Sequence, residues 1–162
     1  MRARTVHQLG EELCIPDITA LLSKFLFEQQ HQDDDASDWP NLPEDHYPLY
    51  DGHIKVVNSA SALFYAPSDV SGIHGMHREF ICSTPLWRNE APRYDCAFVS
   101  ASPATRPMNG LEVVRILAFF SFTFMGAYYP CAVVHWFDCN GDMPDENTGM
   151  WMVRPQFNLW HQ

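Results

Sequence analysis

The sequence predicts an α+β fold, in which an N-terminal amphipathic helix precedes a small, bent antiparallel sheet or partly open β-barrel of about five strands. Apolar residues recur at helical spacing near the N-terminus. Short apolar stretches separated by turn residues follow from residue 53. Two longer aromatic stretches between residues 111 and 137 alternate with the period of two that is typical of strands.

Length and composition limit the possible functions. At 162 residues, 46% of them hydrophobic and 19% charged, the chain is long and apolar enough for one packed domain. Its net charge of −10 repels phosphate backbones, so a general nucleic-acid-binding protein is not expected. No apolar stretch follows the basic N-terminus, so the expected location is intracellular, with the nucleus as one option, and not secreted.

Residues 1–31 form the predicted N-terminal helical segment, with the helical pattern itself over residues 6–31. Pro16 suits a first helical turn, and the turn of helix before it is a weaker prediction. The helix is expected to end near His31. Its apolar stripe recurs at i, i+3, i+4, i+7 and i+8 and consists of Ile18, Leu21, Leu22, Phe25 and Leu26.

Residues 32–52 form a predicted acidic, proline-containing connection. No Lys or Arg occurs between residues 33 and 51, so this segment is expected to be solvated and extended. Its prolines are Pro40, Pro43 and Pro48, and its carboxylates are Asp33, Asp34, Asp35, Asp38, Glu44, Asp45 and Asp51.

Residues 53–154 form the predicted β-rich domain, and residues 155–162 are a tail that is expected to be truncated. Each strand is bounded by proline, glycine or other turn residues. The predicted strands cover residues 53–66, 94–100, 111–124, 127–137 and 148–154.

The two longest strands form a predicted hairpin that turns at Met125 and Gly126. Pro130 is expected at a strand edge or bulge. Residues 116–137 carry no Asp, Glu, Lys or Arg, which raises the alternative of a membrane helix, but their aromatic and β-branched composition favours strands. One face of the first strand is expected to contain Val114, Ile116, Ala118, Phe120, Phe122 and Phe124.

The stretch "GIHGMHREFICSTPLWR", residues 72–88, holds the densest group of reactive side chains. His74, His77 and Cys82 are weak zinc candidates, because imidazole and thiolate are suitable donors but a second ligand pair is missing. A thiol-dependent enzyme with Cys82 as nucleophile is a further alternative. The preferred interpretation is a folded elbow, in which Ile73, Met76 and Phe80 pack inward at helical spacing.

Other candidate residues favour structural roles. "DCNGDMPDENTG", residues 138–149, begins like a calcium loop but lacks its glycine and its final glutamate, so an acidic turn is expected. His135 is interpreted as a hydrogen-bonded structural histidine. The tryptophans are expected in the core. The five cysteines are odd in number and widely spaced, so they are expected to be reduced, with Cys96 and Cys131 as small buried thiols.

Several segments resemble one family. The motifs are "FYAPSD.SG..GM.RE", "RYDC.FV", "YPC..VHWF" and "D..TGMW.V", within residues 49–153. They resemble the C-terminal region of proteins encoded by Plavaka-type (CACTA-like) transposons of basidiomycete fungi. Because the family proteins are much longer, the resemblance implies that this chain is a fragment.

The resemblance also bears on binding. Arg78, Arg88 and Arg93 are the candidate residues for any DNA contact of the kind that the family's basic loop implies, and Trp87 beside Arg88 is a candidate stacking residue. Family members usually carry Gly at the position of His74, Arg at the position of His77 and Arg at the position of Cys82. That departure weakens the zinc and thiol hypotheses and makes this loop less basic than its relatives.

The sequence contains no phosphate loop, nucleophile elbow, HExxH motif or dinucleotide fingerprint. The predicted function is therefore a noncatalytic accessory or interaction module of a fungal transposon protein, with no cofactor. The expected partners are other transposon proteins or DNA. Neither a membrane nor a small-molecule substrate is expected.

Overall fold

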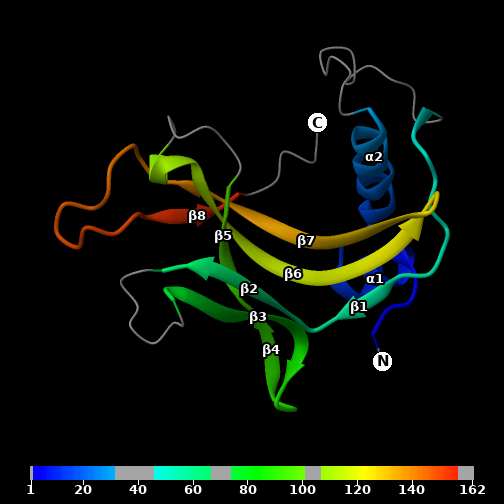
Figure 1. Ribbon diagram of the computed structural model, residues 1–162, viewed down its shortest axis with the longest axis horizontal. Coiled ribbons are helices and arrows are strands. Elements are labelled where there is room, and N and C mark those ends of the chain that lie inside the picture. The colour runs from blue at the N-terminus through cyan, green and yellow to red at the C-terminus, as the bar shows by residue number, and fades with distance from the viewer. Residues whose placement is uncertain (1, 32–45, 67–73, 101–106, 157–162) are drawn as a thin grey trace. The chain divides into compact units, whose positions relative to one another are not determined.

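The computed structural model describes residues 2–31, 46–66, 74–100 and 107–156 (Figure 1). Over these residues the chain forms two helices followed by two sheets of five and three strands, neither of them closed. The predicted α+β class is confirmed. The elements are α1 (Val6–Leu13), α2 (Ile18–Gln30), β1 (Lys55–Val57), β2 (Ser59–Tyr65), β3 (Met76–Trp87), β4 (Ala91–Tyr94), β5 (Cys96–Ser100), η3 (Pro107–Gly110), β6 (Leu111–Phe124), β7 (Ala127–Cys139) and β8 (Val153–Pro155).

The chain divides into two compact units. The helical unit consists of Met1–Val56 and Phe120–Pro130, and the sheet unit consists of Val57–Phe119 and Cys131–Gln162. The strands β6 and β7 pass through both, so the tip of their hairpin belongs to the helical unit.

Two helices, and not one, occupy the predicted helical segment. Thr5 caps α1, because its side-chain oxygen accepts a hydrogen bond from the backbone N–H of Gln8 at 3.3 Å. Cys14 ends α1 in the left-handed conformation, with φ of 57°, and its N–H donates to the carbonyl of Glu11. The chain therefore turns before α2, and Pro16 lies in the turn between the helices.

Aromatic rings form much of the core of the helical unit. Phe122 contacts Tyr50 and Tyr129, with ring centroids 4.7 and 5.3 Å apart, and Phe25 meets Tyr129 edge to face at 6.1 Å. The buried apolar residues of this unit are Val6, Leu9, Ile18, Leu22, Leu26, Phe27, Ile54, Phe120 and Phe122.

The predicted aromatic hairpin is confirmed, and β6 and β7 run side by side as long curved strands (Figure 1). Met125 and Gly126 have φ of 49° and 83°, and two successive positive φ values are typical of a type I′ turn. Pro130 lies within β7, away from the residues that pair with β8. The predicted inward face is buried at Val114, Ile116, Ala118, Phe120 and Phe122, and Phe124 is half-buried.

In the sheet unit the three-stranded sheet has the order β2-β3-β4, and both pairs are antiparallel. The other sheet has the order β1-β6-β7-β8, with β5 also paired to β6. Asp95 connects the two sheets. Its N–H donates to the carbonyl of Cys82 in β3, and its own carbonyl accepts from the N–H of Ile116 in β6, at 2.9 and 3.0 Å.

The predicted folded elbow is wrong, because residues 76–87 form the 12-residue strand β3. Met76 and Phe80 do not pack inward: their side chains are 42% and 67% exposed. Pairing with β2 imposes a side-chain period of two, which overrides the apparent helical spacing. Ile73 lies outside the described residues.

Two further predictions change in detail. The last strand begins at Val153 and not at residue 148, because residues 140–149 are occupied by a turn. The stretch from residue 53 contains two strands, β1 and β2, which belong to different sheets. No helix in the described ranges is long and apolar enough to cross a membrane.

Candidate functional site

The three-stranded sheet presents one face on which large apolar side chains are exposed. Directly paired residues of antiparallel strands point to the same side, and side chains alternate along each strand. The register therefore assigns the paired residues of β2, β3 and β4, and those that alternate regularly with them, to a side. The face in question, called the apolar face below, consists of Ser59, Ser61, Leu63, Tyr65, Met76, Arg78, Phe80, Cys82, Thr84, Trp87, Ala91 and Arg93.

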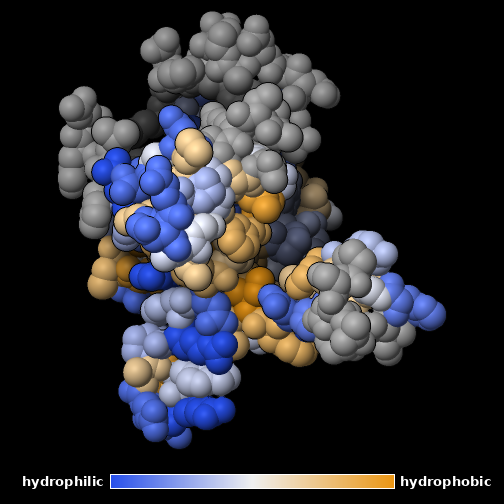
Figure 2. Space-filling view, turned by 90° about the vertical axis from the view of Figure 1, so that its left-hand side faces the viewer, coloured by the Kyte–Doolittle hydropathy of each residue, from blue (hydrophilic) through white to orange (hydrophobic). Residues whose placement is uncertain are grey.

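Five of these side chains are large, apolar and open to solvent. The register places Tyr65 opposite Met76 and Leu63 opposite Arg78. The exposed apolar side chains of β2 and β3 are therefore neighbours and not scattered residues. Contiguous exposed apolar surface of this kind is typical of binding sites. Figure 2 shows hydrophobic surface open to solvent between hydrophilic patches. The exposed fractions are 59% for Leu63, 68% for Tyr65, 42% for Met76, 67% for Phe80 and 37% for Trp87.

Gly75 shapes the far end of the apolar face. Its φ is 75°, in the left-handed region that glycine adopts without strain. A Cβ added at Gly75 would lie 2.7 Å from the ring of Tyr65. Glycine at this position therefore allows the Tyr65 ring to lie against the backbone of the turn.

A β-bulge interrupts the other end of the apolar face. Thr84 pairs with Arg93 but Trp87 pairs with Ala91, so β3 has one extra residue between these pairs. The Thr84 hydroxyl accepts from the N–H of Leu86 at 3.3 Å and donates to the carbonyl of Leu86 at 3.1 Å. These two contacts fix the bulge and with it the direction of Trp87.

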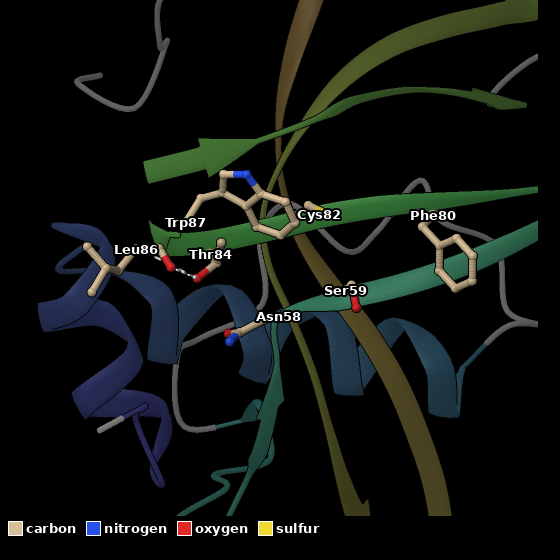
Figure 3. A pocket seen from close by; sticks show the side chains of 7 residues that line it. All are labelled: Asn58, Ser59, Phe80, Cys82, Thr84, Leu86 and Trp87. Atoms are coloured by element: carbon tan, nitrogen blue, oxygen red, sulfur yellow. Dashed lines mark hydrogen bonds between the residues drawn. The ribbon is translucent and has the colours of Figure 1, made fainter. Parts of the chain in front are cut away.

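An open pocket of about 440 Å³ lies beside the bulge (Figure 3). Cys82 and Trp87 lie near each other along β3, with Phe80 further along the same strand (Figure 3). None of the described residues that line the pocket is a histidine. The lining residues are Asn58, Ser59, Phe80, Cys82, Thr84, Leu86 and Trp87.

Three of the four predicted binding residues come together at Trp87. The guanidinium carbons of Arg88 and Arg93 lie 5.6 and 4.7 Å from the centroid of the Trp87 ring, within cation–π range. Arg93 also donates two hydrogen bonds to the carboxylate of Asp95, at 2.9 and 3.1 Å. The Trp87 ring and the Arg93 guanidinium are thus engaged within the chain.

Asp95 stabilises this arrangement. Its carboxylate also accepts a hydrogen bond from the backbone N–H of Cys82 at 2.8 Å. The hydrogen bond from Arg93, which outweighs the opposing effect of desolvation, lowers the pKa of the Asp95 carboxyl below its usual value. The same pair raises the pKa of Arg93. Asp95 is therefore ionised at neutral pH.

Arg78 stands apart from the other three. Arg78 and Trp87 are nine positions apart in β3, roughly 30 Å at the usual strand rise. No carboxylate of the described ranges forms an ion pair with Arg78. Its charge therefore stands among the apolar side chains of Leu63, Met76 and Phe80.

The structure does not bring His74, His77 and Cys82 together. His77 and Cys82 are five residues apart in β3 and so lie on opposite faces, about 16 Å apart along the strand. The His77 ring lies 5.5 Å from that of Phe64, on the side opposite Cys82. His74 lies in the turn before β3 with φ of 54°. No group of three potential metal-binding His, Cys, Asp or Glu residues occurs in the described part of the chain.

The acidic turn and the structural histidine agree with their predictions. The Asp145 carboxylate accepts from the N–H groups of Asn147 and Thr148 and from the Thr148 hydroxyl, at 2.9 to 3.1 Å. These hydrogen bonds, that of the Thr148 side chain foremost, lower the pKa of Asp145. A ring nitrogen of His135 lies 3.0 Å from the backbone carbonyl of Gln156.

The cysteines and tryptophans differ in part from expectation. All five cysteines are free, but Cys96 is exposed and not buried. Burial raises the pKa of the Cys131 thiol. Trp87 and Trp136 are each 37% exposed, so the prediction of core tryptophans is wrong for these two residues.

Reasoning from the sequence missed Leu63 and Tyr65, which give the apolar face its β2 half. One signal was present: residues 59–65, "SASALFY", contain no charge, and three consecutive apolar side chains end the strand. In a strand, consecutive apolar residues place apolar side chains on both faces of the sheet. If either face is left uncovered, that face therefore exposes apolar side chains.

Comparison of the chain with protein-family models, with curated proteins and with solved structures finds no match. The likeness to transposon proteins therefore stays a prediction.

Proposed function

We propose that the chain is a noncatalytic interaction module that binds another protein through the apolar face of the β2-β3-β4 sheet. One observation carries the proposal: the large apolar side chains of Leu63, Tyr65, Met76 and Phe80 lie exposed at neighbouring positions of the paired strands β2 and β3, and Trp87 lies exposed further along the same side. In a Plavaka-type transposon protein, which the sequence resembles, such a module would hold other proteins of the transposition complex together.

Charge favours a protein partner over DNA. The chain carries a net charge of −10, which opposes approach to a phosphate backbone. Base stacking on Trp87, the predicted stacking residue, needs a free ring with free cations beside it. Trp87 and Arg93 contact each other, and Arg93 is neutralised by Asp95. Arg78 is the one cation of the apolar face without an ion-pair partner in the described residues.

The apolar face has enough surface for moderate affinity. Complete burial of a large apolar side chain contributes about 1.5 to 3 kcal/mol relative to full exposure. The five side chains are 37% to 68% exposed, so their further burial offers on the order of 5 kcal/mol. Association itself costs roughly this much or more, so additional contacts must accompany the apolar ones.

A binding assay with matched variants tests the proposal. Phe80→Ser removes an exposed ring from the apolar face, and Phe98→Ser removes an equally exposed ring from β5, at 67% and 65% exposure. Peptides selected against the wild-type chain from a displayed random library should bind Phe80→Ser at least tenfold more weakly and Phe98→Ser unchanged. Equal loss with both variants, or with neither, would contradict the assignment of the apolar face.

The noncatalytic part has its own test. The purified chain is expected neither to cleave nor to join DNA strands in the presence of Mg²⁺ or Mn²⁺. Cleavage or joining that persists through purification and is lost on Cys82→Ser would assign chemistry to the pocket and overturn this part of the proposal.

A further inference from the structure

We infer that the partner contributes an extended segment that pairs with the outer edge of β2 as a fourth strand, and that this segment carries apolar side chains and a carboxylate opposite Arg78. The inference rests on the proposed function and adds the mode of binding and the chemistry of the partner. Addition of a strand to an open sheet edge is a recurring mode of peptide recognition.

The outer edge of β2 offers unpaired backbone groups. Asn58 and Ala66 form hydrogen bonds with Ser83 and Gly75, so the N–H and C=O groups of even-numbered residues of β2 point toward β3. Those of Ser59, Ser61, Leu63 and Tyr65 therefore point away from β3. Within the described residues β2 is an outer strand, and no backbone hydrogen bond reaches this edge.

Nothing in β2 protects the edge. Open edges of natural sheets are commonly blocked by lysine, proline, a bulge or a very short strand. Residues 59–65 contain no charged residue and no proline, and their pairing with β3 is continuous over seven residues. The edge is thus long enough and regular enough to pair with a second strand.

The edge and the apolar face are formed by the same residues. Ser59, Ser61, Leu63 and Tyr65 direct their backbone groups outward and their side chains onto the apolar face. A strand paired to this edge would place alternate side chains beside Leu63 and Tyr65. Apolar side chains at alternate positions would extend the apolar face and cover part of it.

Arg78 determines the charge of the partner. It pairs with Leu63, so a residue of the added strand opposite Leu63 would lie two strand spacings, roughly 10 Å, from Arg78. The side chains of arginine and glutamate together span this distance across Leu63. A carboxylate at that position would pair with the one cation of the apolar face that forms no ion pair within the described residues.

A second copy of the chain fits the edge less well. The apolar face contains Arg78 and Arg93 and no acidic residue, so a second β2 brings no carboxylate to Arg78. Each copy also carries a net charge of −10. An extended segment of another protein that carries apolar side chains and a carboxylate would form hydrogen bonds with the backbone groups of the edge, cover its apolar side chains and pair with Arg78.

Synthetic peptides test the inference on the full chain. The probe is a ten-residue peptide in which valine alternates with threonine, with glutamate in place of one central valine. The uncharged control is the same peptide with glutamine in place of the glutamate. In a second control the glutamate peptide carries N-methyl groups on alternate amides, so that it cannot form the strand hydrogen bonds. Fluorescence anisotropy at 0.15 M salt should show about threefold tighter binding of glutamate than of glutamine, and no binding of the methylated peptide.

Variants of the chain locate the site. Arg78→Gln should abolish the preference for glutamate, whereas Arg154→Gln, an exposed arginine in the short strand β8, should leave it unchanged. Leu63→Pro removes an outward N–H and should weaken binding of both unmethylated peptides at least tenfold. Hydrogen exchange at Phe64 and His77 should confirm that β2 and β3 still pair in this variant.

The outcomes separate this inference from the proposed function. Peptide binding that is lost in Phe80→Ser but unaffected by Leu63→Pro and by N-methylation would overturn strand addition and leave the proposed function standing. Tighter binding of a twelve-nucleotide single-stranded DNA than of the glutamate peptide would overturn both. Concentration-dependent dimers that Leu63→Pro abolishes and the peptide does not displace would assign the edge to a second copy.

Discussion

Asp95 connects several parts of the sheet unit. Its carboxylate accepts hydrogen bonds from Arg93 and from the backbone N–H of Cys82, and its own backbone joins β3 to β6. Because Arg93 in turn contacts Trp87, one carboxylate holds the end of the apolar face in place.

Asp95→Asn should lower the free energy of unfolding by about 1 to 2 kcal/mol at pH 7, since a charge-assisted hydrogen-bond pair is lost at a half-buried site. The pKa of Asp95 is lowered by folding, so its contribution is present above the ordinary aspartate pKa and is lost as the pH falls through the folded value. Urea denaturation of both proteins between pH 7 and pH 3 measures this. A difference that grows on acidification would contradict the role given to Asp95.

Cys14→Gly should raise the free energy of unfolding by about 0.5 to 1 kcal/mol. Cys14 ends α1 with φ of 57°, a conformation that costs glycine less than any other residue. Thermal unfolding followed by circular dichroism measures the gain. Cys14→Ala is the control, because it removes the thiol and keeps the strain, and a similar gain from both variants would show that the backbone conformation is not the cause.

Single residues of the candidate site were only partly predictable. Of the four predicted binding residues, Trp87, Arg88 and Arg93 come together and Arg78 lies apart. That Arg93 pairs with Asp95 and contacts Trp87 could not be predicted from the sequence. Such contacts depend on the register of β3 and β4 and on the bulge after Thr84. A displacement of one residue in register would move Trp87 to the other face.

Among the elements, the β6–β7 hairpin and β3 show when a periodic sequence pattern is sufficient to predict secondary structure and when it is not. In β6 one face is uniformly apolar and the turn residues are explicit, so strand, turn and inward face were all predicted correctly. In β3, apolar and polar residues are mixed on the exposed face because that face is not part of the core. The sequence pattern then fits a helix as well as a strand, and the hydrogen-bonded pairing with β2 is what makes this segment a strand.

Substitutions at the two residues of the β6–β7 turn are expected to change the free energy of unfolding in opposite directions. Met125→Asn should stabilise by about 0.5 kcal/mol, because asparagine tolerates positive φ at the first position of a type I′ turn. Gly126→Ala should destabilise by about 1 kcal/mol. A Cβ at Gly126 has no atom within 4 Å, so strain in the backbone is the whole cause.

Denaturant unfolding of both turn variants measures these differences. Loss of the weak contact between the Gln30 amide and the Met125 sulfur, at 3.2 Å, is expected to reduce the gain slightly. Destabilisation by Met125→Asn together with no effect of Gly126→Ala would indicate a different turn conformation.

For the whole molecule, the residues that stabilise the fold and those that are proposed to bind are distinct. Buried Phe122 and exposed Phe80 show the contrast most simply, at 3% and 67% exposure. The sequence indicated that an apolar core exists, and it predicted the inward face of β6. It could not show which apolar residues stay exposed, since exposure depends on which sheet faces are covered.

Phe122→Ala should therefore lower the free energy of unfolding by about 3 to 4 kcal/mol, whereas Phe80→Ser should change it by less than about 0.5 kcal/mol. Guanidinium unfolding of the two variants measures both values. A large loss for Phe80→Ser would show that the apolar face is covered in solution and would remove its availability to a partner.

The central claim is that the apolar face is a protein-binding surface. Amide chemical-shift mapping of the full chain with the glutamate-containing peptide tests it most directly. The predicted result is a set of shifts confined to β2 and the neighbouring residues of β3, which include Leu63, Tyr65 and Arg78. Shifts that cluster on β5 and β8, or saturating peptide that leaves β2 and β3 unchanged, would contradict the claim.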